Sequence, residues 1–199
     1  MFEISGVHWL VILGALISVG GAFAYIRDTL AGKTKPNRVT WTMWAVAPLI
    51  GTFAAVASNA DLWATARIFL AGFIPLLVVG ASFFNRQSYW KLSAFDALCG
   101  LSSLLALVVW GAIDSPRLAI LFAALGDGLA SIPTIIKAWK HPETETGTVY
   151  VAGLLSVILV IPSIPVWDIE NSAFQIYLLI VNVVLLLAVY RKRWVRAAV

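Results

Sequence analysis

The sequence predicts an all-α membrane protein with seven transmembrane helices, arranged as two three-helix bundles joined by a linker helix. Hydrophobic residues make up 61% of the 199 residues, and charged residues make up only 12%. A soluble domain has about 45–50% apolar and about 25% charged residues. The apolar residues also form long runs and do not alternate with polar ones, which favours helices over strands. We therefore expect most of the chain to lie in a lipid bilayer.

Seven stretches of the chain are long enough to cross a bilayer as helices. A helix needs about 20 mostly apolar residues to span about 30 Å of hydrocarbon. The stretches that meet this requirement are residues 7–26, 39–58, 64–84, 93–113, 117–138, 147–165 and 172–190. The connecting loops are short, and no low-complexity segment indicates a separate soluble domain.

The distribution of Lys and Arg predicts how the helices are oriented. Basic residues concentrate in alternate loops and in the C-terminal tail: Arg27, Lys33, Lys35, Arg38, Arg86, Lys91, Lys137, Lys140, Arg191, Lys192, Arg193 and Arg196. Such loops face the cytoplasm in membrane proteins. We therefore expect a multi-pass protein of the bacterial inner membrane, with its N-terminus outside and its C-terminus in the cytoplasm. The net charge of +4 then reflects topology, and we expect no nucleic-acid partner.

An internal repeat predicts how the helices are grouped. The segment GAFAYIRDTLAGKTKPNRVTWTMW resembles LASIPTIIKAWKHPETETGTVYVAG, about 108 residues further along the chain. This offset pairs the first three helices with the last three and leaves the fourth unpaired. Each helix is paired with the helix four positions further along the chain. Because four is an even number, the two copies share one orientation in the membrane. We expect a first bundle in residues 1–92, a linker helix in residues 93–116, and a second bundle with the basic tail in residues 117–199.

The seven spans, the 3+1+3 order and the motif PTIIKAWK at residues 133–140 resemble the PQ-loop superfamily. That superfamily includes SWEET sugar transporters, proton-coupled lysosomal amino-acid exporters and the KDEL receptor. Tyr25 stands near the position where the first repeat would carry the matching proline. The segments KTKPNRVTWTMW and KHPETE also resemble a family of bacterial membrane proteins without an established activity. The resemblance implies alternating-access transport, with Pro133 as a hinge.

Asp127 is the strongest candidate for a functional residue, because it lies near the middle of the fifth apolar stretch. An aspartate at that depth costs about 2.5–3.5 kcal/mol on insertion scales and normally faces a bundle interior. Asp127, Ser131 and Thr134 are spaced by four and three residues and so share one helix face. This polar stripe predicts a proton-binding or substrate-binding site. The alternative is a structural hydrogen bond between helices.

Two prolines are candidates for hinges within spans. Pro133 and Pro48 each remove one backbone hydrogen bond and kink a helix. For Pro133, the hydroxyl of Ser131 or Thr134 can satisfy the freed carbonyl. Pro133 is interpreted either as a hinge or as a static kink, and Pro48 is interpreted as a second hinge.

Four further side chains complete the predicted site for a small polar solute. Trp44 lies one turn inside the second stretch, where its ring could stack on a flat solute. Asn182 and Gln175 share one face of the seventh stretch, and Asn182 resembles the pocket asparagine of SWEET transporters. Tyr25 continues a stripe of small residues in the first stretch, which suits either a pore wall or close helix packing. The small residues of this stripe are Gly14, Ser18 and Gly21. For Asn182, hydrogen bonding between helices is the alternative.

The sequence favours transport of a sugar, amino acid or vitamin-like solute, and Asp127 offers a route to proton coupling. The alternative is a non-transporting membrane receptor or assembly partner with the same fold, since fold does not fix function. No enzyme motif, no metal-binding spacing and no cofactor motif stands out, so we expect neither catalysis nor a cofactor. The sequence leaves open the solute, the coupling ion and whether the chain forms a homo-oligomer.

Overall fold

A computed structural model describes residues 6–57, 62–87, 90–112, 115–164 and 166–197. In these ranges the chain forms seven α-helices and two short 3-10 helices (η), with no strand. The elements are α1 (Gly6–Leu30), α2 (Arg38–Ala57), α3 (Leu62–Phe84), α4 (Ala94–Ala112), α5 (Pro116–Lys140), η1 (Pro142–Thr144), α6 (Thr148–Val160), η2 (Ile161–Ser163) and α7 (Ile169–Ala197). This confirms the all-helical prediction. Each predicted stretch corresponds to one α-helix, although α6 ends at Val160, short of residue 165, and α7 continues past residue 190 into the basic tail.

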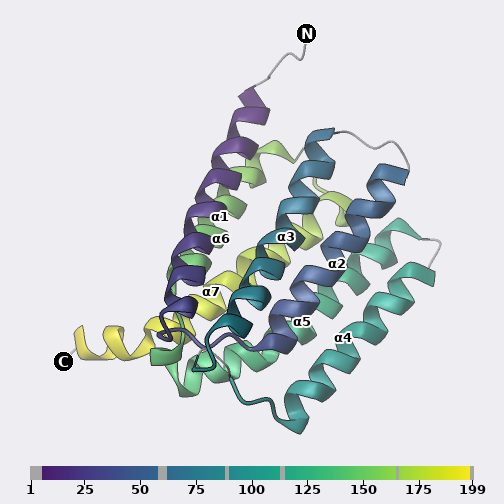
Figure 1. Ribbon diagram of the computed structural model, residues 1–199. Coiled ribbons are helices and arrows are strands. Elements are labelled where there is room, and N and C mark those ends of the chain that lie inside the picture. Colours follow the sequence, from purple (N-terminus) through teal and green to yellow (C-terminus); the bar gives the residue numbers. More distant parts are fainter. Residues whose placement is uncertain (1–5, 58–61, 88–89, 113–114, 165, 198–199) are drawn as a thin grey trace.

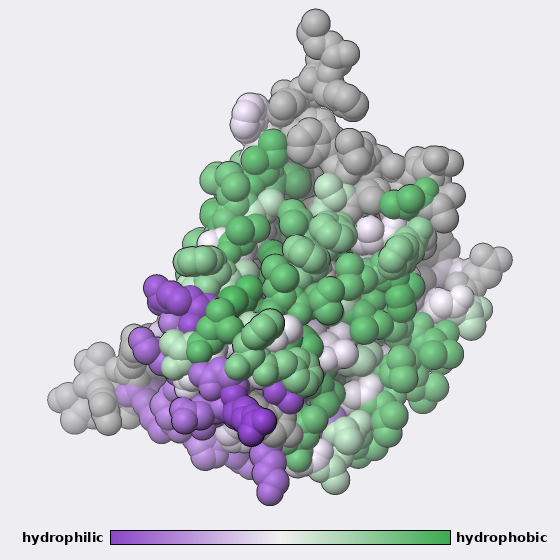
Figure 2. Space-filling view, viewed as in Figure 1, coloured by the Kyte–Doolittle hydropathy of each residue, from purple (hydrophilic) through white to green (hydrophobic). Residues whose placement is uncertain are grey.

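Four segments of these helices are long and apolar enough to cross a membrane. They are Trp9–Leu30, Ala94–Ala112, Ile120–Lys140 and Asn171–Lys192. Large apolar side chains are exposed along them, including Leu101, Leu105 and Val108 on α4. Figure 2 shows the same pattern, with hydrophobic residues covering most of the visible bundle surface. Such a surface suits contact with acyl chains rather than water.

Hydrophilic residues gather at one end of the molecule, which we call the basic end (Figure 2). The odd-numbered helices end there, and α2, α4 and α6 begin there (Figure 1). Its described basic residues are Arg27, Lys33, Lys35, Arg38, Arg86, Lys91, Lys137, Lys140, Arg191 and Lys192. The loops that the sequence predicts to share one side of the membrane therefore do lie at one end of the bundle.

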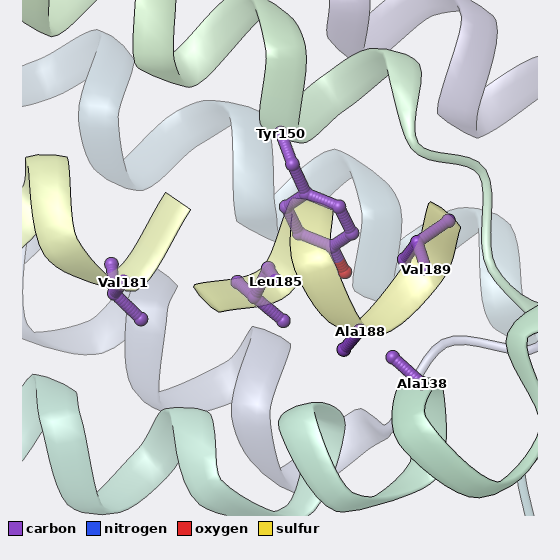
Figure 3. Close-up of a cluster of buried hydrophobic side chains, with 6 residues drawn as sticks. All are labelled: Ala138, Tyr150, Val181, Leu185, Ala188 and Val189. Carbon is purple, nitrogen blue, oxygen red and sulfur yellow. The ribbon is translucent and has the colours of Figure 1, made fainter. Parts of the chain in front are cut away.

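Two buried clusters form the cores of two helix triplets. One joins Tyr25, Trp41 and Val78, from α1, α2 and α3. The other combines α5, α6 and α7 (Figure 3), and its members are Ala138, Tyr150, Val181, Leu185, Ala188 and Val189. Between the triplets, α1 packs on α6 and α2 packs on α5, while α4 lies against α5 and α2.

The contact between α1 and α6 depends on small residues. A Cβ added to Gly21 would lie 2.3 Å from the Ala152 Cβ, and one added to Gly14 would lie 3.0 Å from the Ser156 Oγ. In lipid, helices gain little from the hydrophobic effect and associate through close packing instead. The stripe of small residues on α1 therefore serves helix packing over this part of its length.

We expect Gly21→Ala to lower the thermal unfolding midpoint of detergent-purified protein, because overpacking costs about 1–3 kcal/mol. Gly20 provides a matched control, since an added Cβ there would meet nothing within 4 Å. Gly20→Ala should leave the midpoint unchanged or raise it slightly, because alanine favours a helix by about 1 kcal/mol over glycine. Equal midpoints for the two variants would contradict tight packing of α1 against α6.

Candidate functional site

Asp127 lies where α5 meets α2 and α7. The Tyr177 hydroxyl on α7 donates a hydrogen bond of 2.6 Å to Asp127 Oδ2. The indole Nε1 of Trp44 on α2 donates to the Asp127 backbone carbonyl at 3.4 Å. The Asp127 carboxylate is thus hydrogen-bonded to a neighbouring helix. This bond offsets part of the cost of removing the carboxylate from water.

The two hydroxyls of the predicted polar stripe also lie inside the protein. Ser131 is 2% exposed and Thr134 is fully buried. Ser131 donates to the Gly128 carbonyl at 2.7 Å. Thr134 donates to Thr40 at 2.9 Å and so links α5 to α2. The face of α5 predicted from helical spacing therefore does point into the bundle.

A small cavity adjoins Asp127 on the side of α5 that faces α2 and α4. Its volume is about 10 Å³, which is close to the minimum for one water molecule. The lining residues are Met43, Ala47, Ser103, Leu107, Phe122, Ala123, Gly126 and Asp127. In this conformation the space beside the carboxylate admits a water molecule but no sugar or amino acid.

Three of the predicted site residues lie apart from the hydrogen bonds around Asp127. The Asn182 Nδ2 donates to the Leu178 carbonyl within α7 at 2.8 Å. Its amide oxygen faces Gly153 of α6, where an added Cβ would lie 2.6 Å from it. Gln175 is half-buried on α7, and Tyr25 lies at the basic end. Of the four side chains added to the polar stripe, the structure joins Trp44 directly to Asp127.

Both candidate hinge prolines lie inside helices, and α5 stays helical through Pro133 as far as Lys140. The Thr52 hydroxyl donates to the Pro48 carbonyl at 2.9 Å. Ser131 bonds to the carbonyl of Gly128, whereas Pro133 removes the donor to Leu129. Neither Ser131 nor Thr134 therefore restores the bond that Pro133 breaks, and this turn of α5 has one fewer intrahelical hydrogen bond.

A second polar cluster lies at the basic end and centres on Glu145, in the segment between η1 and α6. Glu145 forms a buried ion pair with Lys137 of α5. The hydroxyls of Tyr25 and Tyr150 donate to its other oxygen at 3.0 and 2.9 Å. Lys137 also donates to the Lys35 backbone carbonyl. We call these five residues the Glu145 cluster.

The segments around the Glu145 cluster are joined by further hydrogen bonds. The Lys35 backbone N–H donates to the Thr144 carbonyl at 2.9 Å. The hydroxyls of Thr34 and Thr146 bond to each other, and Thr146 also donates to Asp28 Oδ2 at 3.0 Å. The loop after α1 and the loop after α5 are thus connected through both backbone and side chains.

Sequence spacing did not identify Tyr177, Glu145 or Lys137 as site residues. Lys137 offered a signal, because a lysine inside an apolar stretch requires a buried partner or an aqueous surface. Glu145 lies in a polar loop, and nothing in its surroundings predicts burial. Tyr177 lies 50 residues from Asp127, and no local pattern links the two.

Asp96 has a structural role at the start of α4. Its Oδ2 accepts hydrogen bonds from the Ser93 backbone N–H and hydroxyl at 2.6 and 2.7 Å. The Asp96 N–H donates back to the Ser93 hydroxyl, so the pair forms a capping box at the start of α4. Asn37 Nδ2 donates to the other carboxylate oxygen at 2.9 Å, which ties α4 to the start of α2.

No group of three or more His, Cys, Asp or Glu residues in the described ranges could hold a metal ion. Comparisons of the chain with protein-family models, curated proteins and solved structures find no match. Any functional inference therefore comes from the residues of this chain.

We expect Glu145→Gln to lower the stability of the protein strongly, because it leaves the Lys137 ammonium buried without a counter-charge. Breaking a buried pair in this way costs about 3–5 kcal/mol. Glu143 is a matched control in the same loop, since its side chain is 61% exposed and lies 3.6 Å from Lys192. Glu143→Gln should cost about 0–1 kcal/mol, as for surface ion pairs generally. Chemical denaturation in detergent would compare the free energies of unfolding of the two variants. Similar losses would contradict the claim that the buried ion pair contributes more than the exposed one.

Proposed function

We propose that this protein transports a small polar solute across the bacterial inner membrane by alternating access. The observation that carries the proposal is the Asp127 carboxylate, held near the middle of an apolar helix by Tyr177. Intramembrane carboxylates are costly and usually mark a solute or proton pathway. The proposed solute is a sugar, an amino acid or a vitamin-like molecule, and protonation of Asp127 would couple its movement to a proton.

The grouping of the helices supports two similar halves related as in a PQ-loop-like 3+1+3 repeat. If α1, α2 and α3 correspond to α5, α6 and α7, each half contains the same pair of internal contacts, first helix to third and second helix to third. The two contacts between the halves, α1 with α6 and α2 with α5, are exchanged by the same correspondence. Each half also has its own buried core.

The proposed binding face lies on the α5 side of the junction between the halves. Asp127 would bind a hydroxyl or ammonium group, Ser131 would add a hydrogen bond, and Trp44 would stack on the solute. Asn182 and Gln175 on α7 would join this face only when the second bundle rearranges. Because the cavity beside Asp127 holds about one water molecule, the present conformation would be a closed one.

The concentration of Lys and Arg at the basic end supports its placement in the cytoplasm. Pro133 and Pro48 would supply bending points on α5 and α2, which form one of the two helix pairs at the junction. A missing backbone hydrogen bond makes a helix easier to bend at that turn.

A second candidate function is that of a membrane receptor or assembly partner that does not transport. The small volume beside Asp127 favours this candidate, because a binding pocket for a solute usually measures about 300–1,000 Å³. In that case Asp127 and Tyr177 would serve as a structural hydrogen bond between α5 and α7.

We expect at least one solute to raise the thermal unfolding midpoint of purified protein in a screen of sugars, amino acids, nucleosides and vitamins at two pH values. The same solute should enter proteoliposomes that contain the protein. Asp127→Asn should abolish both effects, because the amide cannot take up a proton and binds a cation poorly. Asp168→Asn is the control, since Asp168 accepts a hydrogen bond from the backbone N–H of Asn171 outside the apolar segments. Uptake that is equal in the two variants would remove Asp127 from the mechanism and favour the second candidate.

A further inference from the structure

We propose that the Glu145 cluster is a gate that seals the basic end and opens when its ion pair separates. This inference rests on the proposed transport function and identifies the part of the molecule that would control access from the cytoplasmic side. Along α5, Lys137 lies nearer the basic end than Asp127 and than Thr134, which bonds to Thr40.

The contacts of the cluster connect the two proposed halves of the molecule. Tyr25 of α1 donates to Glu145, which belongs to the second half. In the opposite sense, Lys137 of α5 donates to the Lys35 carbonyl in the first half. The neighbouring bonds of Thr34 and Lys35 to residues 144 and 146 run between the same two loops. Residues 144–146 and Lys137 therefore link the two halves at this end.

Burial makes this connection a seal. The side chains of Lys137 and Glu145 are 1% and 0% exposed. Tyr25 is fully buried, and its ring packs on Trp41 with centroids 4.7 Å apart. The Lys137 ammonium lies 5.6 Å from the centroid of the Trp90 ring. Aromatic rings and the paired charges together leave almost no exposed surface on the two charged side chains.

The chemistry of the seal suits repeated opening. A buried ion pair is often no more stable than apolar packing of the same volume, because both charges have lost their hydration. When the end opens, the Lys137 ammonium and the Glu145 carboxylate regain water, which offsets much of the lost attraction. An apolar seal would instead expose hydrophobic surface on opening.

The position of Lys137 connects the gate to the candidate hinge. Lys137 follows Pro133 by four residues on α5, so the two lie on the same face of that helix. Bending α5 at Pro133 would move Lys137 relative to the Lys35 carbonyl and to Tyr25, both of which belong to the first half. The Thr134–Thr40 hydrogen bond lies at the same turn as Pro133, and its two side chains are fully buried.

The test measures how readily a reporter cysteine behind the gate is reached from the basic end. Thr40→Cys is the reporter, in a Cys99→Ser background that removes the native thiol. Inside-out membrane vesicles are treated with a membrane-impermeant maleimide, and the labelling rate is followed by mass shift on a gel. We expect Glu145→Gln to raise the rate by about tenfold or more, because labelling follows the population of the open state. Glu143→Gln, the exposed control in the same loop, should leave the rate unchanged.

Two milder variants keep the test decisive if Glu145→Gln fails to fold. Tyr25→Phe and Tyr150→Phe each remove one hydrogen bond to Glu145 and keep the ion pair, so both should raise labelling by a smaller factor. Thermal unfolding is measured alongside, and labelling is performed well below the midpoint of each variant. If labelling in all folded cluster variants equals that of Glu143→Gln, the cluster is a static link and the gate is refuted.

The labelling test and the uptake test can fail separately. Unchanged labelling combined with uptake that depends on Asp127 would refute the gate and leave the transport function in place. Raised labelling combined with uptake that ignores Asp127 would support an opening basic end and refute the proposed binding site.

Discussion

The Glu145 carboxylate fixes the arrangement of the basic end, because a buried negative charge must be surrounded by donors. Lys137 supplies the counter-charge, and Tyr25 and Tyr150 supply two hydroxyls. These donors come from α5, α1 and α6, so satisfying one carboxylate determines how three helices meet. Without them, the free-energy cost of burying the charge would exceed what packing at this end could return.

The carboxylates of Asp127 and Glu145 are held by different numbers and kinds of donors. Glu145 has a cation and two hydroxyls, whereas Tyr177 is the side chain that hydrogen-bonds to Asp127 in the part of the chain that the structure describes. A carboxylate has about four acceptor positions, so Asp127 keeps capacity for another donor. This difference is the basis on which we propose binding or proton uptake for Asp127 and closure for Glu145. The first role needs unused hydrogen-bonding capacity, and the second needs a buried carboxylate that is paired with a cation and held by further donors.

Close helix packing sets the remaining geometry. Gly21 and Gly14 let α1 approach α6, and a Cβ on Gly72 would lie 2.9 Å from the Ala45 carbonyl oxygen on α2. Small residues allow such approach where lipid provides little hydrophobic driving force. These tight contacts fix how closely α1 approaches α6 and how closely α2 approaches α3.

The sequence by itself determined the all-helical class, the positions of the helices and the gathering of Lys and Arg at one end. These features follow from the length of apolar runs and from charge near their ends, which are local properties. Helical spacing also predicted that Asp127, Ser131 and Thr134 face inward. Only the tertiary structure decided that Tyr177 holds Asp127, that Asn182 faces α6 and that Glu145 is buried. Those outcomes depend on helix rotation and on contacts such as Tyr25 with Glu145, 120 residues apart, which no local pattern encodes.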